Sequence, residues 1–143
     1  MPIAALVTWV ITAGFGSFML VRWASRRRVA GADTHFPPAR VFSHFGLAAA
    51  GLVVWIIYLV TDIGLLAWIA FADLVLVALL GGLLVNRWAK DGRAAMSAAG
   101  QPDAAAVDLA EQHIPRTPVV LHGIFAVSTV ILVLLSAAGV GGS

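Results

Sequence analysis

The 143-residue chain contains no cysteine, and charged residues make up only 11% of it, whereas 61% is hydrophobic. The absence of cysteine excludes disulfide bonds, thiolate metal sites and thiol-based catalysis. So few charged residues could not cover the surface of a water-soluble domain of this size. Hydrolase signatures are also missing, because there is no phosphate-binding loop, no HExxH motif and no serine, histidine and aspartate pattern. The composition therefore favours an integral membrane protein, and it leaves open whether the chain is an enzyme of another class.

Four apolar segments account for the hydrophobic composition, and each is long enough to span a bilayer as a helix. They cover about residues 3–21, 41–61, 65–85 and 118–138. No basic residue precedes the first segment, so we interpret it as a retained helix and not as a signal peptide. The sequence thus predicts an all-α integral membrane protein, a single four-helix bundle over residues 1–143 with a minimal turn at 61–64.

The positive charge is confined to two polar loops. The nine basic residues are Arg22, Arg26, Arg27, Arg28 and Arg40 in the first loop and Arg87, Lys90, Arg93 and Arg116 in the second. The positive-inside rule places both loops in the cytoplasm and both termini outside. The pI of about 9.9 has this local cause and does not indicate nucleic-acid binding. The richness in alanine, glycine, valine and arginine resembles a high-GC bacterial proteome, which favours a bacterial inner membrane.

A ten-residue motif, H-x-P-x-x-x-V-x-x-H, occurs twice, at residues 35–44 and 113–122. The two copies contain all four histidines of the chain and are offset by 78 residues. A second match, RWA at 22–24 and 87–89, has an offset of 65 residues. We interpret the chain as two helix–loop–helix repeats, residues 1–61 and 65–138. Two spans per repeat give both copies the same orientation, so a pseudo-twofold axis along the membrane normal is expected.

The second histidine of each motif, His44 or His122, is predicted to lie inside the bundle at the same depth as its counterpart. A histidine in a membrane span is costly, and function is the default hypothesis for it. Two symmetry-related imidazoles could ligate a b-type haem from opposite sides, with Arg22 and Arg87 pairing with its propionates. This layout resembles four-helix b-type membrane cytochromes in its architecture. Our first hypothesis is therefore a haem-carrying electron-transfer protein that exchanges electrons with a quinone or a partner subunit.

Other interpretations of the histidines remain open. The first histidine of each motif, His35 or His113, precedes a proline and is expected on the loop or an interfacial turn. If the loops fold back, His35, His44, His113 and His122 together could bind or transport a transition metal ion. Alternatively, the histidines stabilise the fold through hydrogen bonds. The protein would then be a cofactor-free accessory subunit, associated with other membrane subunits or with itself.

Asp73 is a carboxylate within the third predicted span. An intramembrane carboxylate is expected to face the bundle interior, where it pairs, takes up a proton or contacts water. It is therefore a candidate for a proton path. The structural alternative is a neutral side chain hydrogen-bonded to Thr8, Thr12 or Tyr58.

Two further features lie in the basic loops. Trp23 and Trp88 follow Arg22 and Arg87, as expected for aromatic anchors at a membrane interface. Residues 102–112 could form a short alanine-rich helix, with Asp103 as its N-cap.

Overall fold

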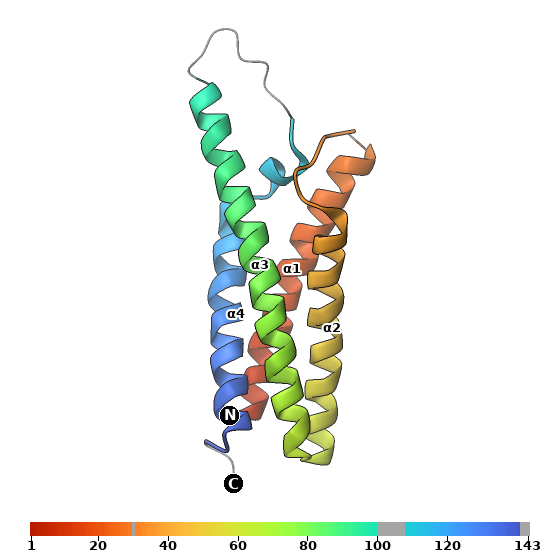
Figure 1. Cartoon of the computed structure of the whole chain (residues 1–143), viewed down its shortest axis with the longest axis vertical. Helices are drawn as coiled ribbons and strands as arrows, with labels where there is room; N and C mark the ends of the chain where they lie inside the picture. The colour runs from red at the N-terminus through yellow and green to blue at the C-terminus, as the bar shows by residue number, and fades with distance from the viewer. Residues whose placement is uncertain (30, 100–107, 141–143) are drawn as a thin grey trace.

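The computed structural model describes residues 1–29, 31–99 and 108–140. Over these residues the chain is helical, with four long helices and one short 3₁₀ helix (Figure 1). Their bounds are α1 Pro2–Val29, α2 Pro38–Thr61, α3 Gly64–Ala98, η1 Ala110–His113 and α4 Arg116–Ala137. All four α-helices are long and apolar enough to cross a membrane. This confirms the predicted class of four apolar helices.

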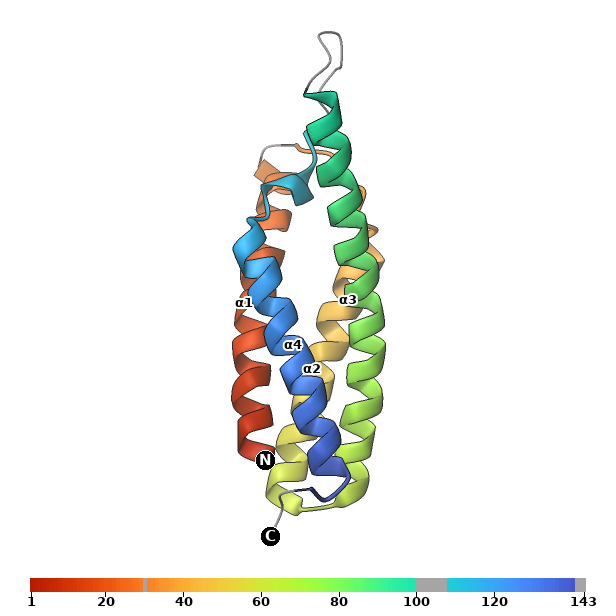
Figure 2. The same ribbon diagram turned by 90° about the vertical axis from the view of Figure 1, so that its left-hand side faces the viewer.

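The four helices run alternately up and down, so the two chain termini lie at the same end (Figures 1 and 2). α1 packs mainly against α4, and α2 packs mainly against α3. Weaker contacts join α3 to α4 and α1 to α2, whereas α2 and α4 have no backbone contact within the described residues. α2 and α4 therefore occupy opposite corners of the bundle.

The helix ends have local causes. Pro38 is the first residue of α2, and Pro115 directly precedes α4; a proline lacks the amide hydrogen that the first turn of a helix does not use. α2 ends where Asp62 adopts a left-handed backbone (φ 55°) and its amide donates to the carbonyl of Tyr58 at 2.8 Å. The predicted turn at residues 61–64 is confirmed.

Both loops lie at one end of the bundle, which we call the basic end because it carries the arginine-rich segments. Here α3 continues past the other helices to Ala98, well beyond the predicted span, as Figure 1 shows. The predicted short helix over residues 102–112 falls largely outside the described residues. Its last part coincides with the beginning of η1 at Ala110.

Large apolar side chains cover the outside of the bundle. Examples are Ile3, Val21, Val60, Leu65 and Leu79, which are between 62% and 82% exposed. A water-soluble monomer rarely exposes so large an apolar surface, whereas lipid chains would cover it. The exposed surface is therefore consistent with helices that cross a bilayer.

The interior contains two apolar clusters at different levels. One lies near the termini and consists of Ala5, Trp9, Trp55, Ala67, Ala70, Leu74 and Val133. The other lies at the basic end and consists of Trp23, Phe36, Ala110 and Ile114. On α2, residues on one side of His44 pack against the first cluster and residues on the other side pack against the second. The same is true of the residues on either side of His122 on α4. The level of the two histidines is thus closed on both sides by packed apolar side chains.

Candidate functional site

The structure brings His44 of α2 and His122 of α4 together in the bundle. Their ring centroids are 6.2 Å apart and their planes are inclined by 59°. Both side chains are half-buried. Because α2 and α4 stand at opposite corners, the rings approach each other across the middle of the bundle.

Each of these two rings is held by a backbone carbonyl of a neighbouring helix. Nδ1 of His44 lies 2.9 Å from the carbonyl oxygen of Val77 on α3, and Nδ1 of His122 lies 2.9 Å from that of Thr12 on α1. A carbonyl oxygen only accepts, so Nδ1 must donate its hydrogen in both bonds. In the neutral imidazole the lone pair then resides on Nε2, which is the atom free to bind a metal.

A glycine lies beside each ring, one helical turn from the carbonyl that holds it. A Cβ on Gly81 would lie 3.0 Å from Cε1 of His44, and a Cβ on Gly16 would lie 3.2 Å from Cε1 of His122. Real Cβ atoms are rarely so close to a neighbouring atom. Each imidazole can therefore approach the neighbouring helix, α3 for His44 and α1 for His122, only because a glycine is present there.

Asp73 lies one turn from Val77 on α3, on the side away from the basic end. Its Oδ2 atom is buried and has no hydrogen-bond partner. The carboxyl fills a notch at Gly51 of α2, where any Cβ would overlap Oδ2 and would lie 3.1 Å from the indole ring of Trp9. The Thr8 and Thr12 hydroxyls, two of the three partners that the sequence suggests for Asp73, donate instead to carbonyls within α1.

The other closely packed pair, α1 with α4, has a contact between two hydroxyl groups at the level that corresponds to Asp73. Thr129 of α4 lies about two helical turns beyond His122, and its Oγ1 is 3.0 Å from that of Thr8 on α1. The single hydroxyl hydrogen of Thr129 is shared between Thr8 Oγ1 and the carbonyl oxygen of Phe125, which lies 2.8 Å away. At this level, therefore, α1 and α4 are joined by a hydrogen bond between side chains, whereas α2 and α3 enclose an unpartnered carboxyl oxygen.

His35 and His113 lie outside the bundle interior and have different partners. Nδ1 of His35 is 3.0 Å from Oδ1 of Asp91, whereas Nε2 of His113 is 2.6 Å from Oδ1 of the exposed Asp108. Within the described residues, these four imidazoles do not form a single group of ligand atoms. The group that does form combines His35, Asp91 and Glu111, whose ligand atoms lie within 4.8 Å of one another.

Glu111 connects η1 to the loop between α1 and α2, although nothing in the sequence pattern had singled it out. Its side chain is fully buried and accepts two hydrogen bonds, from the amide of His35 at 2.6 Å and from the Thr34 hydroxyl at 2.7 Å. The Thr34 hydroxyl in turn accepts from the indole nitrogen of Trp23 at 3.0 Å. With these partners the carboxylate is satisfied, and it fastens the basic-end loops to α1.

Arg22, Arg87 and Trp23 lie at this end as predicted, but with contacts that the sequence did not indicate. Nε of Arg87 is 3.1 Å from Oδ2 of Asp91. The guanidinium of Arg22 lies over the Phe18 ring, 5.8 Å from its centroid. Trp23 is only 2% exposed, so it belongs to the basic-end cluster and is not a surface anchor.

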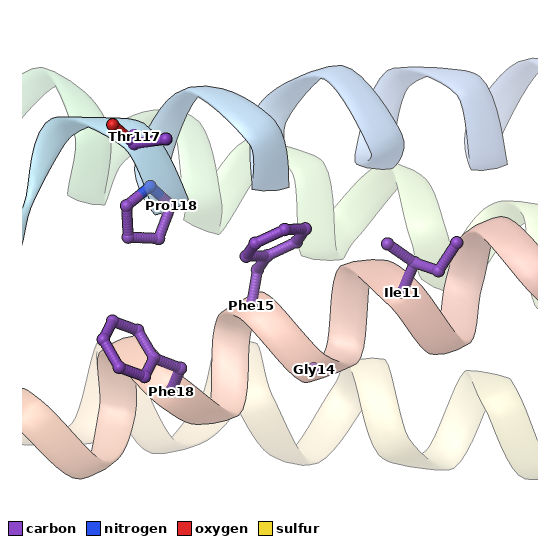
Figure 3. A pocket seen from close by; sticks show the side chains of 6 residues that line it. All are labelled: Ile11, Gly14, Phe15, Phe18, Thr117 and Pro118. Carbon is purple, nitrogen blue, oxygen red and sulfur yellow. The ribbon is translucent and has the colours of Figure 1, made fainter.

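A groove on the outside of the bundle lies between α1 and the beginning of α4 (Figure 3). Its volume is about 550 Å³, and it is lined by Ile11, Gly14, Phe15, Phe18, Thr117 and Pro118. Thr117 supplies the only polar side chain of this lining. The groove therefore lacks the converging polar groups of a specific ligand site, and its apolar lining suits contact with lipid chains.

Comparison of the chain with protein-family models, curated proteins and solved structures gives no significant match.

Proposed function

We propose that this chain is an integral membrane electron-transfer protein that binds haem b between His44 and His122. Haem b supplies one-electron chemistry at its iron. The bundle supplies two axial imidazoles and a water-poor interior. The electron partner is a quinone in the bilayer or a neighbouring membrane subunit.

The paired imidazoles are the observation that carries this proposal. Two imidazoles on opposite sides of one metal ion, with metal–nitrogen bonds of about 2.0–2.1 Å, have ring centroids roughly 6 to 6.5 Å apart. The separation between His44 and His122 is 6.2 Å. The carbonyls of Val77 and Thr12 set the tautomer that leaves Nε2 free, as is usual for metal-bound histidine.

A macrocycle held by both histidines would lie between the two rings. The line between the rings runs from one corner of the bundle to the opposite corner, so the plane between them extends toward α1 and α3. Gly16 and Gly81 on those helices support the arrangement because the absence of a side chain there lets each imidazole reach its position. Arg22 and Arg87 are proposed partners of the propionates; Arg87 would then share its charge with Asp91.

The repeated contacts support a pseudo-twofold relation between residues 1–61 and 65–138. The carbonyl acceptors Thr12 and Val77 are 65 residues apart, as are Gly16 and Gly81, and the two histidines are 78 apart. These are the two offsets of the sequence repeat. In the proposed topology the axis is along the membrane normal, the basic end is cytoplasmic and the protein belongs to a bacterial inner membrane.

The absorption spectrum of the purified protein tests this function. Protein from haem-supplemented cells is expected to have a Soret band that is absent from the His44→Ala/His122→Ala double variant. The matched control, His35→Ala/His113→Ala, removes the same number of imidazoles outside the bundle and should keep the band. A folded but colourless wild-type protein, or a band that the two double variants retain equally, would contradict haem binding at this pair.

Binding of a transition metal ion is the alternative function. The group formed by His35, Asp91 and Glu111 supports it. One imidazole and two carboxylates within 4.8 Å would be a chemically suitable ligand set. In this interpretation only the His35 copy of the outer pair takes part, because His113 bonds to Asp108. Elemental analysis after mild purification should then find metal that is lost in Glu111→Gln and kept in Asp108→Asn. Metal content that neither substitution changes would exclude this site.

A further inference from the structure

Asp73 is an isolated ionisable group in the apolar part of the bundle. Within the spans predicted above, the other titratable side chains are His44 and Tyr58 on α2 and His122 on α4. The span of α1 contributes none, and α3 contributes only Asp73 itself. No lysine or arginine lies in these spans, so no positively charged side chain at this depth can pair with the carboxylate.

The surroundings of Asp73 favour an uncharged carboxyl. Oδ2 is buried without a hydrogen-bond partner. It faces the Gly51 backbone and the indole ring of Trp9, neither of which offers a positive charge. An unpaired carboxylate is strongly disfavoured in such a medium, and a bound proton removes the charge. A proton neutralises the carboxyl without any further space beside the buried Oδ2 atom.

The notch is specific to one helix pair. At the corresponding positions of α1 and α4 the residues are Thr8 and Thr129, which hydrogen-bond to each other. Only α2, with Gly51 in place of a side chain, leaves space for a carboxyl. The protein therefore combines two similar histidine contacts with a single carboxyl.

We propose that Asp73 is a proton-binding site whose occupancy is linked to the charge on the histidine pair. Asp73 lies one helical turn, about 6 Å along the axis, from Val77, the residue whose carbonyl holds His44. At about 10 Å and an effective dielectric constant of about 20, a unit charge changes an equilibrium at the other group by roughly tenfold. Were haem held by the two histidines, an electron taken up there from a quinone or partner subunit would add one negative charge, and Asp73 would then bind its proton more tightly; loss of the electron to the next carrier would reverse this. The link to an electron rests on the proposed function, whereas proton binding itself does not.

Carbodiimide labelling tests the site without any cofactor. Dicyclohexylcarbodiimide, an apolar reagent, adds to a protonated carboxyl in apolar surroundings; the carboxyl proton moves to nitrogen, a stable acylurea forms and nothing leaves. Peptide mass mapping over a range of pH values should find one adduct at Asp73, in an amount that falls as the pH rises and the proton is lost. Asp73→Asn should remove this adduct, and Asp62→Asn, in the exposed turn, should keep it. Folded protein unlabelled at Asp73 throughout this range, or labelled equally at Asp62 and Asp73, would overturn the proposal.

The redox potential tests the linkage. In haem-loaded protein the midpoint potential should fall with rising pH by about 59 mV in total as Asp73 loses its proton, which is the roughly tenfold change in the equilibrium converted to a potential. Asp73→Asn should flatten this dependence, and Asp73→Glu should restore part of it. Equal slopes in wild type and Asp73→Asn would overturn the linkage. A colourless protein that is still labelled at Asp73 would instead contradict electron transfer and support the proton site.

Discussion

The two main helix pairs, α2 with α3 and α4 with α1, position their histidines alike but differ above and below them. At the histidine level each pair has one imidazole, one carbonyl acceptor at 2.9 Å and one glycine. One turn away, the first pair encloses the Asp73 carboxyl whereas the second has a threonine hydrogen bond. The two histidines therefore have equivalent surroundings, whereas the carboxyl occurs in only one of the two pairs.

The outer histidines show the same contrast at the basic end. His35 belongs to a buried network with Asp91 and Glu111, whereas His113 bonds to the exposed Asp108. Glu111→Gln replaces one of the two accepting carboxylate oxygens with an NH2 group, which only donates, and should destabilise the protein by about 2–3 kcal/mol. Thermal unfolding in detergent measures this. Asp108→Asn is the matched control and should have no measurable effect on stability. An equal loss of stability in the two variants would contradict the difference between the surroundings of His35 and His113.

Gly51→Ala should produce the next largest effect, because the new methyl group would overlap the Asp73 carboxyl. Overpacking of this kind costs about 1–3 kcal/mol. In an Asp73→Ala background the same substitution should cost much less, since the carboxyl is gone. The double-variant cycle in thermal unfolding measures the coupling. If the costs were simply additive, the carboxyl would not occupy the notch.

Gly16→Ala and Gly81→Ala should have similar effects on the two histidines. Each adds a methyl group 3.2 or 3.0 Å from an imidazole carbon and should cost about 1–2 kcal/mol as the ring is displaced. Haem affinity should fall in both variants to a comparable degree. Gly14→Ala, with open space around its Cβ, is the control for helix propensity. A large loss in only one of the two variants would show that the helix pairs do not contribute equally.

Thr129→Val should produce the smallest effect. Valine keeps the shape but removes the hydrogen bond to Thr8, at a cost of about 1 kcal/mol. Haem binding should not change, because the hydroxyl does not contact His122 within the described contacts. Loss of the Soret band in this variant would place Thr129 in the cofactor site and contradict the view that the threonine contact is separate from the histidine site.

The helices and the inner histidines were predictable, because both depend on local sequence. Apolar segments of bilayer length imply helices, and a repeated motif implies that His44 and His122 occupy equivalent places. Which backbone carbonyls hold the rings, however, depends on the packing of neighbouring helices, which periodicity does not encode.

The basic-end network could not be predicted for a related reason. Asp91 lies on an extension of α3 beyond the predicted span, and Glu111 lies in a loop between apolar segments. They meet His35 only because η1 docks against the end of α1. The only local signal was the spacing of Arg87 and Asp91, four residues apart, which permits an ion pair on one helix face. The position of Asp73 against Gly51 likewise depends on how α2 and α3 align.

Ligation by both histidines can be tested most directly with the electron paramagnetic resonance and absorption spectra of His44→Ala and His122→Ala as single variants. Wild-type protein loaded with haem should be six-coordinate and low-spin. Either substitution alone should convert it to a high-spin form or release the haem, and the two variants should behave alike. A low-spin spectrum that survives either substitution unchanged would contradict paired ligation by His44 and His122.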